Sequence, residues 1–133
     1  MRYPNLPEVL ALAELAIGLP DSAHRNTEMC RLIDSALHSP QATFDGQDLI
    51  PEIHAKAAVL CRHVCLNHPF PDGNKRMAWL ITLLFLELNG HQMYEDDIRA
   101  ICVMVEIASS NTNQDEITAA FSRWIRPKTH QLV

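Results

Sequence analysis

Apolar residues recur at every third or fourth position along most of this chain, which is the spacing of residues on one face of an α-helix. The pattern predicts about six helices of ordinary length. In chain order, their predicted inner faces are Val9, Leu10, Ala13 and Ile17; Met29, Leu32, Ile33, Ala36 and Leu37; Ile53, Ala57, Leu60, Cys61 and Val64; the apolar part of 74–88; Ile98, Ile101, Cys102 and Val105; and Ile117, Ala120, Phe121, Trp124 and Ile125.

Residues that favour helix ends mark the boundaries between these segments. Gly18-Leu19-Pro20 ends the first segment, and Thr27 is the predicted N-cap of the second. A third helix is predicted to begin near Pro51, because proline is favoured in a first helical turn. Asn89-Gly90 is a typical C-terminal signal for the fourth helix. The tail after Pro127 is predicted to be frayed.

Strand-like sequence is confined to one short stretch. Ala42-Thr43-Phe44, followed by Asp45-Gly46, predicts a very short hairpin or flap. The chain has no internal repeat, low-complexity tract or linker. We therefore predict a single all-α domain over residues 1–133, a compact bundle of about six helices with this small flap.

The predicted helix over 74–88 differs from the others. Residues 77–86 are apolar on all sides, which predicts a central helix buried by its neighbours. Its first turn is polar instead, with Asn74, Lys75 and Arg76. Free N–H groups and the positive end of the helix dipole also lie there. The head of this central helix is therefore a candidate anion site.

Composition and charge narrow the possible partners. The 133 residues are 47% hydrophobic and 20% charged, which is enough for a core without disulfide or metal staples. With 11 basic and 16 acidic residues the net charge is −5, and no basic cluster suits direct contact with a nucleic acid. The longest apolar run, 77–86, is too short to span a membrane. With no secretory signal among the first residues and four dispersed cysteines, we expect a cytoplasmic protein with reduced thiols.

The loop that leads into the central helix carries a set of groups suited to phosphoryl or nucleotidyl transfer. His68 can accept a proton from an attacking hydroxyl near neutral pH. Asp72 offers the hard oxygen ligand that Mg²⁺ prefers beside phosphates. Gly73 allows the backbone to approach an anion closely. Lys75 and Arg76 add positive charge where such a transition state is negative.

Each of these residues also has a plainer interpretation. A histidine at a helix end is commonly a surface or capping residue, and Pro71-Asp72-Gly73 is a common turn sequence. Lys75 and Arg76 taken alone would be solvated charges. Phe70 is predicted to be a hydrophobic anchor and not a chemical group. Their combination at the head of a buried helix favours catalysis over these separate explanations.

The loop His68-Pro-Phe-Pro-Asp-Gly-Asn-Lys-Arg76 closely resembles the signature of the Fic/Doc superfamily, H-x-F-x-[DE]-G-N-[GK]-R. The resemblance extends from 19–20 through 35–37, 40–41 and 44 to the stretch 85–90, and so covers most of the chain. It implies the Fic/Doc fold and a transferase activity.

Two positions place the resemblance on the Doc branch of the superfamily. Typical Fic proteins transfer AMP and have glycine where this chain has Lys75, and they carry a second arginine where it has Trp79. The Doc branch comprises toxins of Phd–Doc-type toxin–antitoxin modules. It implies a kinase that transfers the γ-phosphate of ATP to a Ser/Thr hydroxyl of elongation factor Tu or another translation-related protein, and so blocks translation.

The resemblance also implies a role for each residue of the loop. His68 would be the general base and Asp72 the Mg²⁺ ligand. Phe70 would anchor the loop. The phosphates of ATP would be held by Gly73, Asn74, Lys75 and Arg76. The flap at 42–46 would align the target by strand addition, although Ser39 departs from the basic residue common just before Pro40 in Doc-type sequences.

A partner protein is implied as well. The chain lacks the inhibitory motif [ST]-x-x-x-E-[GN] of some Fic proteins. A separate Phd-like antitoxin would then supply the inhibition. Two alternatives to the kinase remain open: an AMP transferase on the same scaffold, and a catalytically silent module that mainly binds an antitoxin.

Cysteine and histidine residues between 61 and 68 raise a further alternative, a zinc site. Cys61 and Cys65 share one helix face, whereas His63 points elsewhere and a second ligand pair is missing. A buried thiol pair is the better interpretation. Cys30 and Cys102 are predicted to be small core residues.

Overall fold

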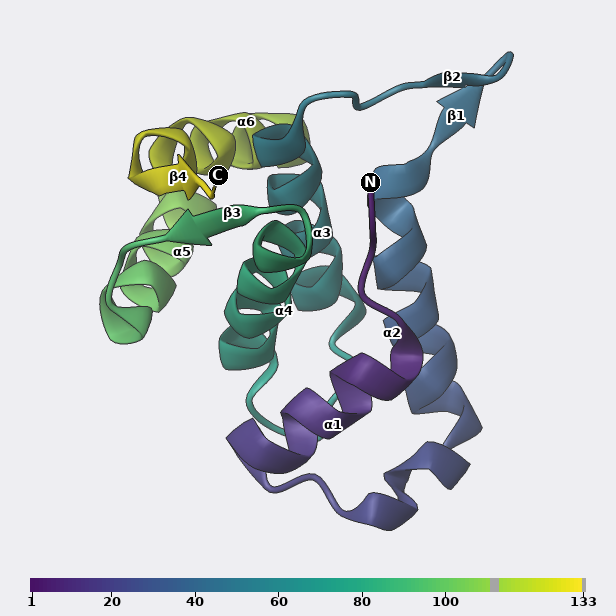
Figure 1. The fold of residues 1–133 in the computed structure, drawn as a ribbon. Coiled ribbons are helices and arrows are strands. Elements are labelled where there is room, and N and C mark those ends of the chain that lie inside the picture. The colour runs from purple at the N-terminus through teal and green to yellow at the C-terminus, as the bar shows by residue number, and fades with distance from the viewer. Residues whose placement is uncertain (111–112, 133) are drawn as a thin grey trace.

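A computed structural model of the chain describes residues 1–110 and 113–132. Within these ranges it confirms the predicted all-α class, with six α-helices, one of which is central (Figure 1). The α-helices are α1 (Leu6–Ile17), α2 (Thr27–His38), α3 (Ile53–Asn67), α4 (Asn74–Leu88), α5 (Asp97–Ser110) and α6 (Gln114–Ile125); short 3₁₀ turns are η1 (Asp21–Arg25), η2 (Ser39–Gln41) and η3 (Arg126–Lys128). None of the described helices is long and apolar enough to cross a membrane.

Two small antiparallel ribbons accompany the helices. The predicted flap is confirmed: β1 (Thr43–Phe44) pairs with β2 (Gln47–Asp48). A second ribbon pairs β3 (His91–Met93) with β4 (Thr129–Gln131), His91 opposite Gln131. The prediction of a frayed tail after Pro127 was therefore wrong. Three residues of the tail form backbone hydrogen bonds to the segment that follows α4, a pairing too short for its sequence to signal.

Helix α4 forms the centre of the molecule, as predicted. Its fully buried side chains include Trp79 and Phe85, the two aromatic residues of the helix. Trp79 contacts Phe121 of α6 edge-on, with ring centroids 6.4 Å apart, and its indole N–H donates to Asp97 Oδ1 at 2.8 Å. Tyr3, in the segment before α1, stacks on Phe85 at 5.5 Å. Side chains from both ends of the chain thus cover the same helix.

Helix starts differ from prediction by one or two residues because of the caps that are used. Asn26, and not Thr27, caps α2 by accepting from the Met29 amide at 3.0 Å. Glu52 caps α3 and accepts from the Ala55 amide at 2.8 Å. Asparagine is at least as good an N-cap as threonine, so the residue beside the expected cap took its place.

Helix α5 buries less of its surface than predicted. Ile98 is 75% exposed, and Cys102 is also exposed, so the prediction that both lie in the core was wrong. Ile101 of the predicted face does pack against the core, together with Met104 and Ile107. The inner face is therefore rotated from the one that the apolar spacing suggests, because both faces of the helix carry apolar residues.

A buried lysine holds the base of the flap. Lys56 of α3 is 1% exposed. Its ammonium group donates to the Pro40 carbonyl at 2.7 Å and pairs with Asp48 Oδ2 at 2.7 Å. It also lies 5.5 Å from the centre of the Tyr3 ring. Burial acts to lower the pKa of Lys56, but its contacts with Asp48 and Tyr3 outweigh burial and raise it.

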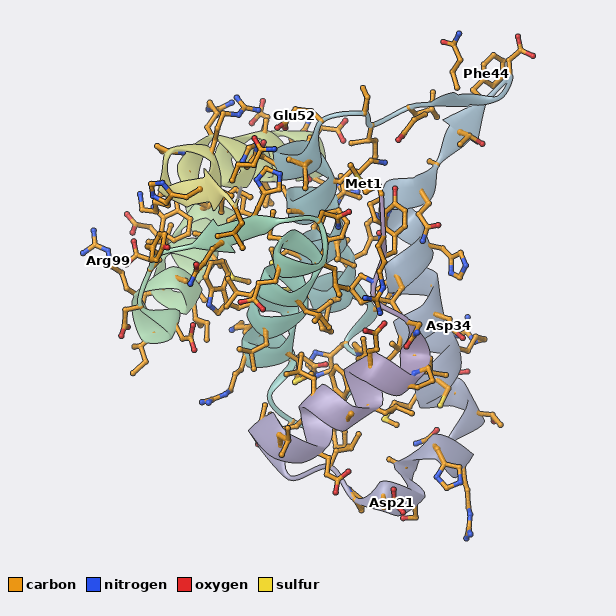
Figure 2. The ribbon with its side chains drawn as sticks, viewed as in Figure 1. Met1, Asp21, Asp34, Phe44, Glu52 and Arg99 are labelled. Atoms are coloured by element: carbon orange, nitrogen blue, oxygen red, sulfur yellow. The ribbon has the colours of Figure 1, made fainter. Side chains whose placement is uncertain are left out.

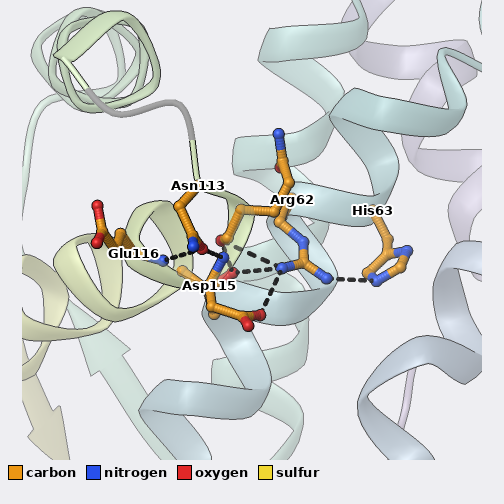
Figure 3. Close-up of polar contacts among 7 residues, drawn as sticks. Arg62, His63, Asn113, Asp115 and Glu116 are labelled. Carbon is orange, nitrogen blue, oxygen red and sulfur yellow. Dashed lines mark hydrogen bonds and ion pairs between the residues drawn. The ribbon is translucent and has the colours of Figure 1, made fainter.

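An arginine joins α3 to the start of α6 (Figure 3). Arg62 Nη1 donates to the Gln114 carbonyl at 3.2 Å and to Thr118 Oγ1 at 3.0 Å. Its Nη2 donates to His63 Nε2 at 3.0 Å. Burial, followed by the neighbouring Arg62 charge, lowers the pKa of His63. His63 therefore contacts the arginine that joins α3 to α6.

Replacing Lys56 tests this account of the flap base. Lys56→Met keeps the aliphatic stem but leaves the Pro40 carbonyl without its donor, so the free energy of unfolding should fall by about 1–3 kcal/mol. Urea denaturation measures the change. Asp48→Asn is the matched variant and should cost less, because Asp48 is accessible to water. Equal stability of Lys56→Met and the unaltered protein would contradict the anchoring role.

Candidate functional site

The signature loop lies between α3 and α4, at the end of the molecule where α1 crosses (Figure 1). Asn67, the last residue of α3, donates from Nδ2 to the Leu32 carbonyl of α2 at 3.0 Å. His68 follows in the left-handed conformation, with φ of 48°, and its amide donates to the Val64 carbonyl at 3.1 Å. This conformation is uncommon for a residue other than glycine. It ends the helix abruptly and leaves the imidazole exposed at the mouth of the loop.

One buried asparagine gives the loop its shape. Asn74 Oδ1 accepts from the Phe70 amide at 2.9 Å, and Asn74 Nδ2 donates to the Phe70 carbonyl at 2.8 Å. Phe70 itself is 2% exposed, in agreement with its predicted anchoring. Both ends of the Asn74 amide are thus directed inward. For an anion at the surface, the group that Asn74 offers is its backbone N–H.

Gly73 lies at the point where the loop turns into α4. Its φ of 75° is in the left-handed region. A Cβ added there would lie 2.8 Å from Ile17 Cγ2 at the end of α1. Both observations require glycine. No side chain caps α4, so the amides of its first turn remain open toward the loop. Ile17 therefore bounds the site, a role that its place in an apolar stripe did not reveal.

The charged residues of the signature surround this open helix end. Asp72 is exposed, and its Oδ1 accepts from the Gly73 amide at 2.8 Å, which leaves the other carboxylate oxygen to solvent. Lys75 and Arg76 are exposed and form no ion pair within the described part of the chain. The structure therefore gathers His68, Asp72, Lys75 and Arg76 at one helix end, with two cations unpaired.

The flap lies away from this site. It precedes the start of α3, whereas the signature loop follows its end, so the 15 residues of that helix separate them. At the helical rise this is about 22 Å. Phe44 marks the flap tip and projects from the body of the molecule (Figure 2). In this structure the flap is therefore not placed to align a target at His68.

Cys61 and Cys65 form the predicted thiol pair, but only Cys61 is buried and Cys65 is half-buried. Cys61 is 3% exposed, and the two thiols contact each other. The hydrogen bond from Cys61, followed by the charge of Lys75, lowers the pKa of Cys65 against the effect of burial. Among the described residues no group of three His, Cys, Asp or Glu side chains is placed to hold a metal ion. His63 faces Arg62 instead.

Substitution of Gly73 should show how strictly the loop depends on the close approach of its backbone to Ile17. Gly73→Ala forces a positive φ on alanine and a clash with Ile17, so we expect a loss of about 1–3 kcal/mol in unfolding free energy. Thermal or urea unfolding measures it. Ile17→Ala in the same chain removes the clashing atoms and should relieve part of the additional loss. Full additivity of the two variants would argue against the contact.

Comparison with known proteins agrees with this geometry. The sequence model described as the Fic/DOC family matches residues 3–86. The chain is 42% identical over 119 residues to "Toxin Doc" of Mycolicibacterium smegmatis, covering 88% of each protein. No solved structure gives a significant match. The family match and the identity lead to one conclusion: this chain belongs to the Fic/DOC family.

Proposed function

We propose that this protein is a Doc-like toxin that phosphorylates a Ser/Thr hydroxyl of a translation factor such as elongation factor Tu, with ATP as the donor. The observation that carries the proposal is the open head of α4, where His68, Asp72, Lys75 and Arg76 lie exposed around uncapped amides. The 42% identity to a protein named Toxin Doc supports the biological class. A Phd-like antitoxin would be its cognate partner.

In the proposed reaction His68 accepts the proton of the target hydroxyl. The hydroxyl oxygen then attacks the γ-phosphorus. The bond between this phosphorus and the oxygen that bridges it to the β-phosphate breaks, and ADP leaves. The N–H groups of the first turn of α4, with Lys75 and Arg76, stabilise the negative charge on the transferred phosphoryl group.

Asp72 is the residue that would hold Mg²⁺. Its carboxylate is a hard oxygen donor, exposed, with only one oxygen engaged by a backbone amide. When bound there, Mg²⁺ would neutralise charge on the phosphates. The bond from the Gly73 amide fixes the carboxylate against the loop. It therefore reduces the freedom that metal binding would otherwise have to remove.

The choice of the γ-phosphate depends on two positions. Lys75 adds a cation next to the first turn of α4, where AMP-transferring Fic proteins have glycine. Trp79 replaces the second arginine of those proteins, and its side chain is fully buried with its N–H donated to Asp97. Compared with those Fic proteins, this chain has its additional cation in the first turn of α4, at Lys75, and has none at position 79. This arrangement favours a reversed nucleotide, with the γ-phosphate toward His68.

An AMP transferase is the second candidate function, because the same catalytic histidine could act on either phosphorus. A silent antitoxin-binding module is the third. The exposed and unpaired side chains of the loop favour an enzyme over the module, since a docking role does not require them.

Labelled ATP distinguishes these candidates. Purified protein, Mg²⁺ and elongation factor Tu are incubated with ATP labelled at either the γ- or the α-phosphate. We expect label on the target from γ only. Transfer from α would make the protein an AMP transferase. If neither label is transferred, repeating the assay in a whole-cell lysate tests other targets.

Two loop variants test the assigned roles. His68→Ala should lower the transfer rate by at least about 100-fold, the usual contribution of general-base catalysis, and should abolish growth arrest on expression. Asp72→Asn should lose transfer while keeping its melting temperature, because the carboxylate is exposed. His24→Ala, at an exposed site on η1, is the control and should leave both readouts unchanged. Growth arrest by His68→Ala would show that catalysis by His68 is not the toxic act.

A further inference from the structure

Three side chains that carry sulfur line one cavity where α3, α5 and α6 pack together. Cys61 and Cys65 are one turn apart on the same face of α3, and each thiol affects the pKa of the other. Met104 comes from α5, with its Sδ 3.9 Å from Cys61 Sγ. All three residues line a single cavity of about 70 Å³.

Few other groups in the lining of this cavity could bind a ligand. Its wall is mainly apolar, with Ala58, Ile117 and Phe121 among the residues that line it. Arg62 also borders the cavity, but its guanidinium group donates to Gln114, Thr118 and His63. Thr118 lines the cavity too, and its hydroxyl donates to the Gln114 carbonyl at 3.0 Å. The sulfur atoms are the remaining donor groups of the lining.

Thiolate and thioether sulfur together select soft monovalent ions, above all Cu⁺. With a metal–sulfur bond of about 2.3 Å, three sulfurs around a trigonal ion lie about 4.0 Å apart. The Cys61–Met104 separation of 3.9 Å matches that spacing without movement of either helix. A cavity of about 70 Å³ also exceeds the ~10–15 Å³ that a single water needs.

We propose that Cys61, Cys65 and Met104 form a three-coordinate site for Cu⁺. On binding, each thiol releases one proton to solvent, two metal–thiolate bonds and one metal–thioether bond form, and no electron is transferred. The resulting site carries one net negative charge. Lys75 is near enough to Cys65 for their charges to interact, so it would offset part of that charge. Zinc fits less well, since it takes four ligands.

Metal titration of the reduced protein tests the site independently of the proposed toxin activity. Because Cys30 and Cys102 also carry thiols, the parent is the full chain with Cys30→Ser and Cys102→Ser. Cu⁺ is added without oxygen in competition with a chromogenic chelator. We expect one ion per chain and a sulfur-only shell of three ligands by X-ray absorption.

Single variants in this parent decide which sulfurs take part. Cys65→Ser should abolish stoichiometric binding. Met104→Leu conserves volume and, because it removes a direct ligand, should weaken binding by at least the roughly 10- to 100-fold that loss of an outer partner costs. Met29→Leu replaces another buried methionine and should have no effect. Circular dichroism melts confirm that each variant is folded.

Two results would overturn the proposal. One is the absence of stoichiometric Cu⁺ binding by the folded parent. The other is a Met104→Leu variant that binds as tightly as the parent with a two-sulfur shell, which would reduce the site to an ordinary dithiol.

Discussion

Helix α4 has no polar face, and the need to cover it on every side determines the arrangement of the other elements. Its buried residues include Trp79, Ile81 and Phe85. Helix α3 lies along it, α5 packs on it as well, α6 contributes Phe121, and the segment before α1 contributes Tyr3. A lone apolar helix would lose the free energy of hydrophobic burial, so the helix is stable only inside this shell. The shell in turn requires the chain to enter and leave α4 at the surface.

The candidate site follows from that entry point. A helix buried along its length still begins with N–H groups that lack partners, and here no side chain supplies them. The loop before it is held by Asn74 across Phe70, and by the contact between Gly73 and Ile17. These interactions are structural. The side chains of Lys75 and Arg76 form no ion pair within the described residues, and Asp72 engages only one of its carboxylate oxygens, with the Gly73 amide. Packing thus rigidifies the backbone while the chemical groups remain available.

Sequence patterns were sufficient for the helices and the loop because both depend on local signals. The boundaries of α4 were predicted without error, and the anchoring of Phe70 follows from an apolar residue in a polar loop. Contacts between distant segments carried no such signal. The β3–β4 pairing involves three residues on each strand, and Ile17 meets Gly73 only through the crossing of α1. Ile98 was misplaced because α5 has apolar residues on both faces, so spacing could not select the inner one.

Position 79 shows how packing and chemistry constrain each other within one family fold. An arginine there would bring a charge to the interior side of α4, where it is stable only with an anion nearby. The indole of Trp79 instead fills that space, contacts Phe121 and donates to Asp97 on the first turn of α5. The residue therefore strengthens the core and the attachment of α5. The same replacement leaves Lys75 and Arg76 as the exposed cations in the first turn of the helix, outside the core.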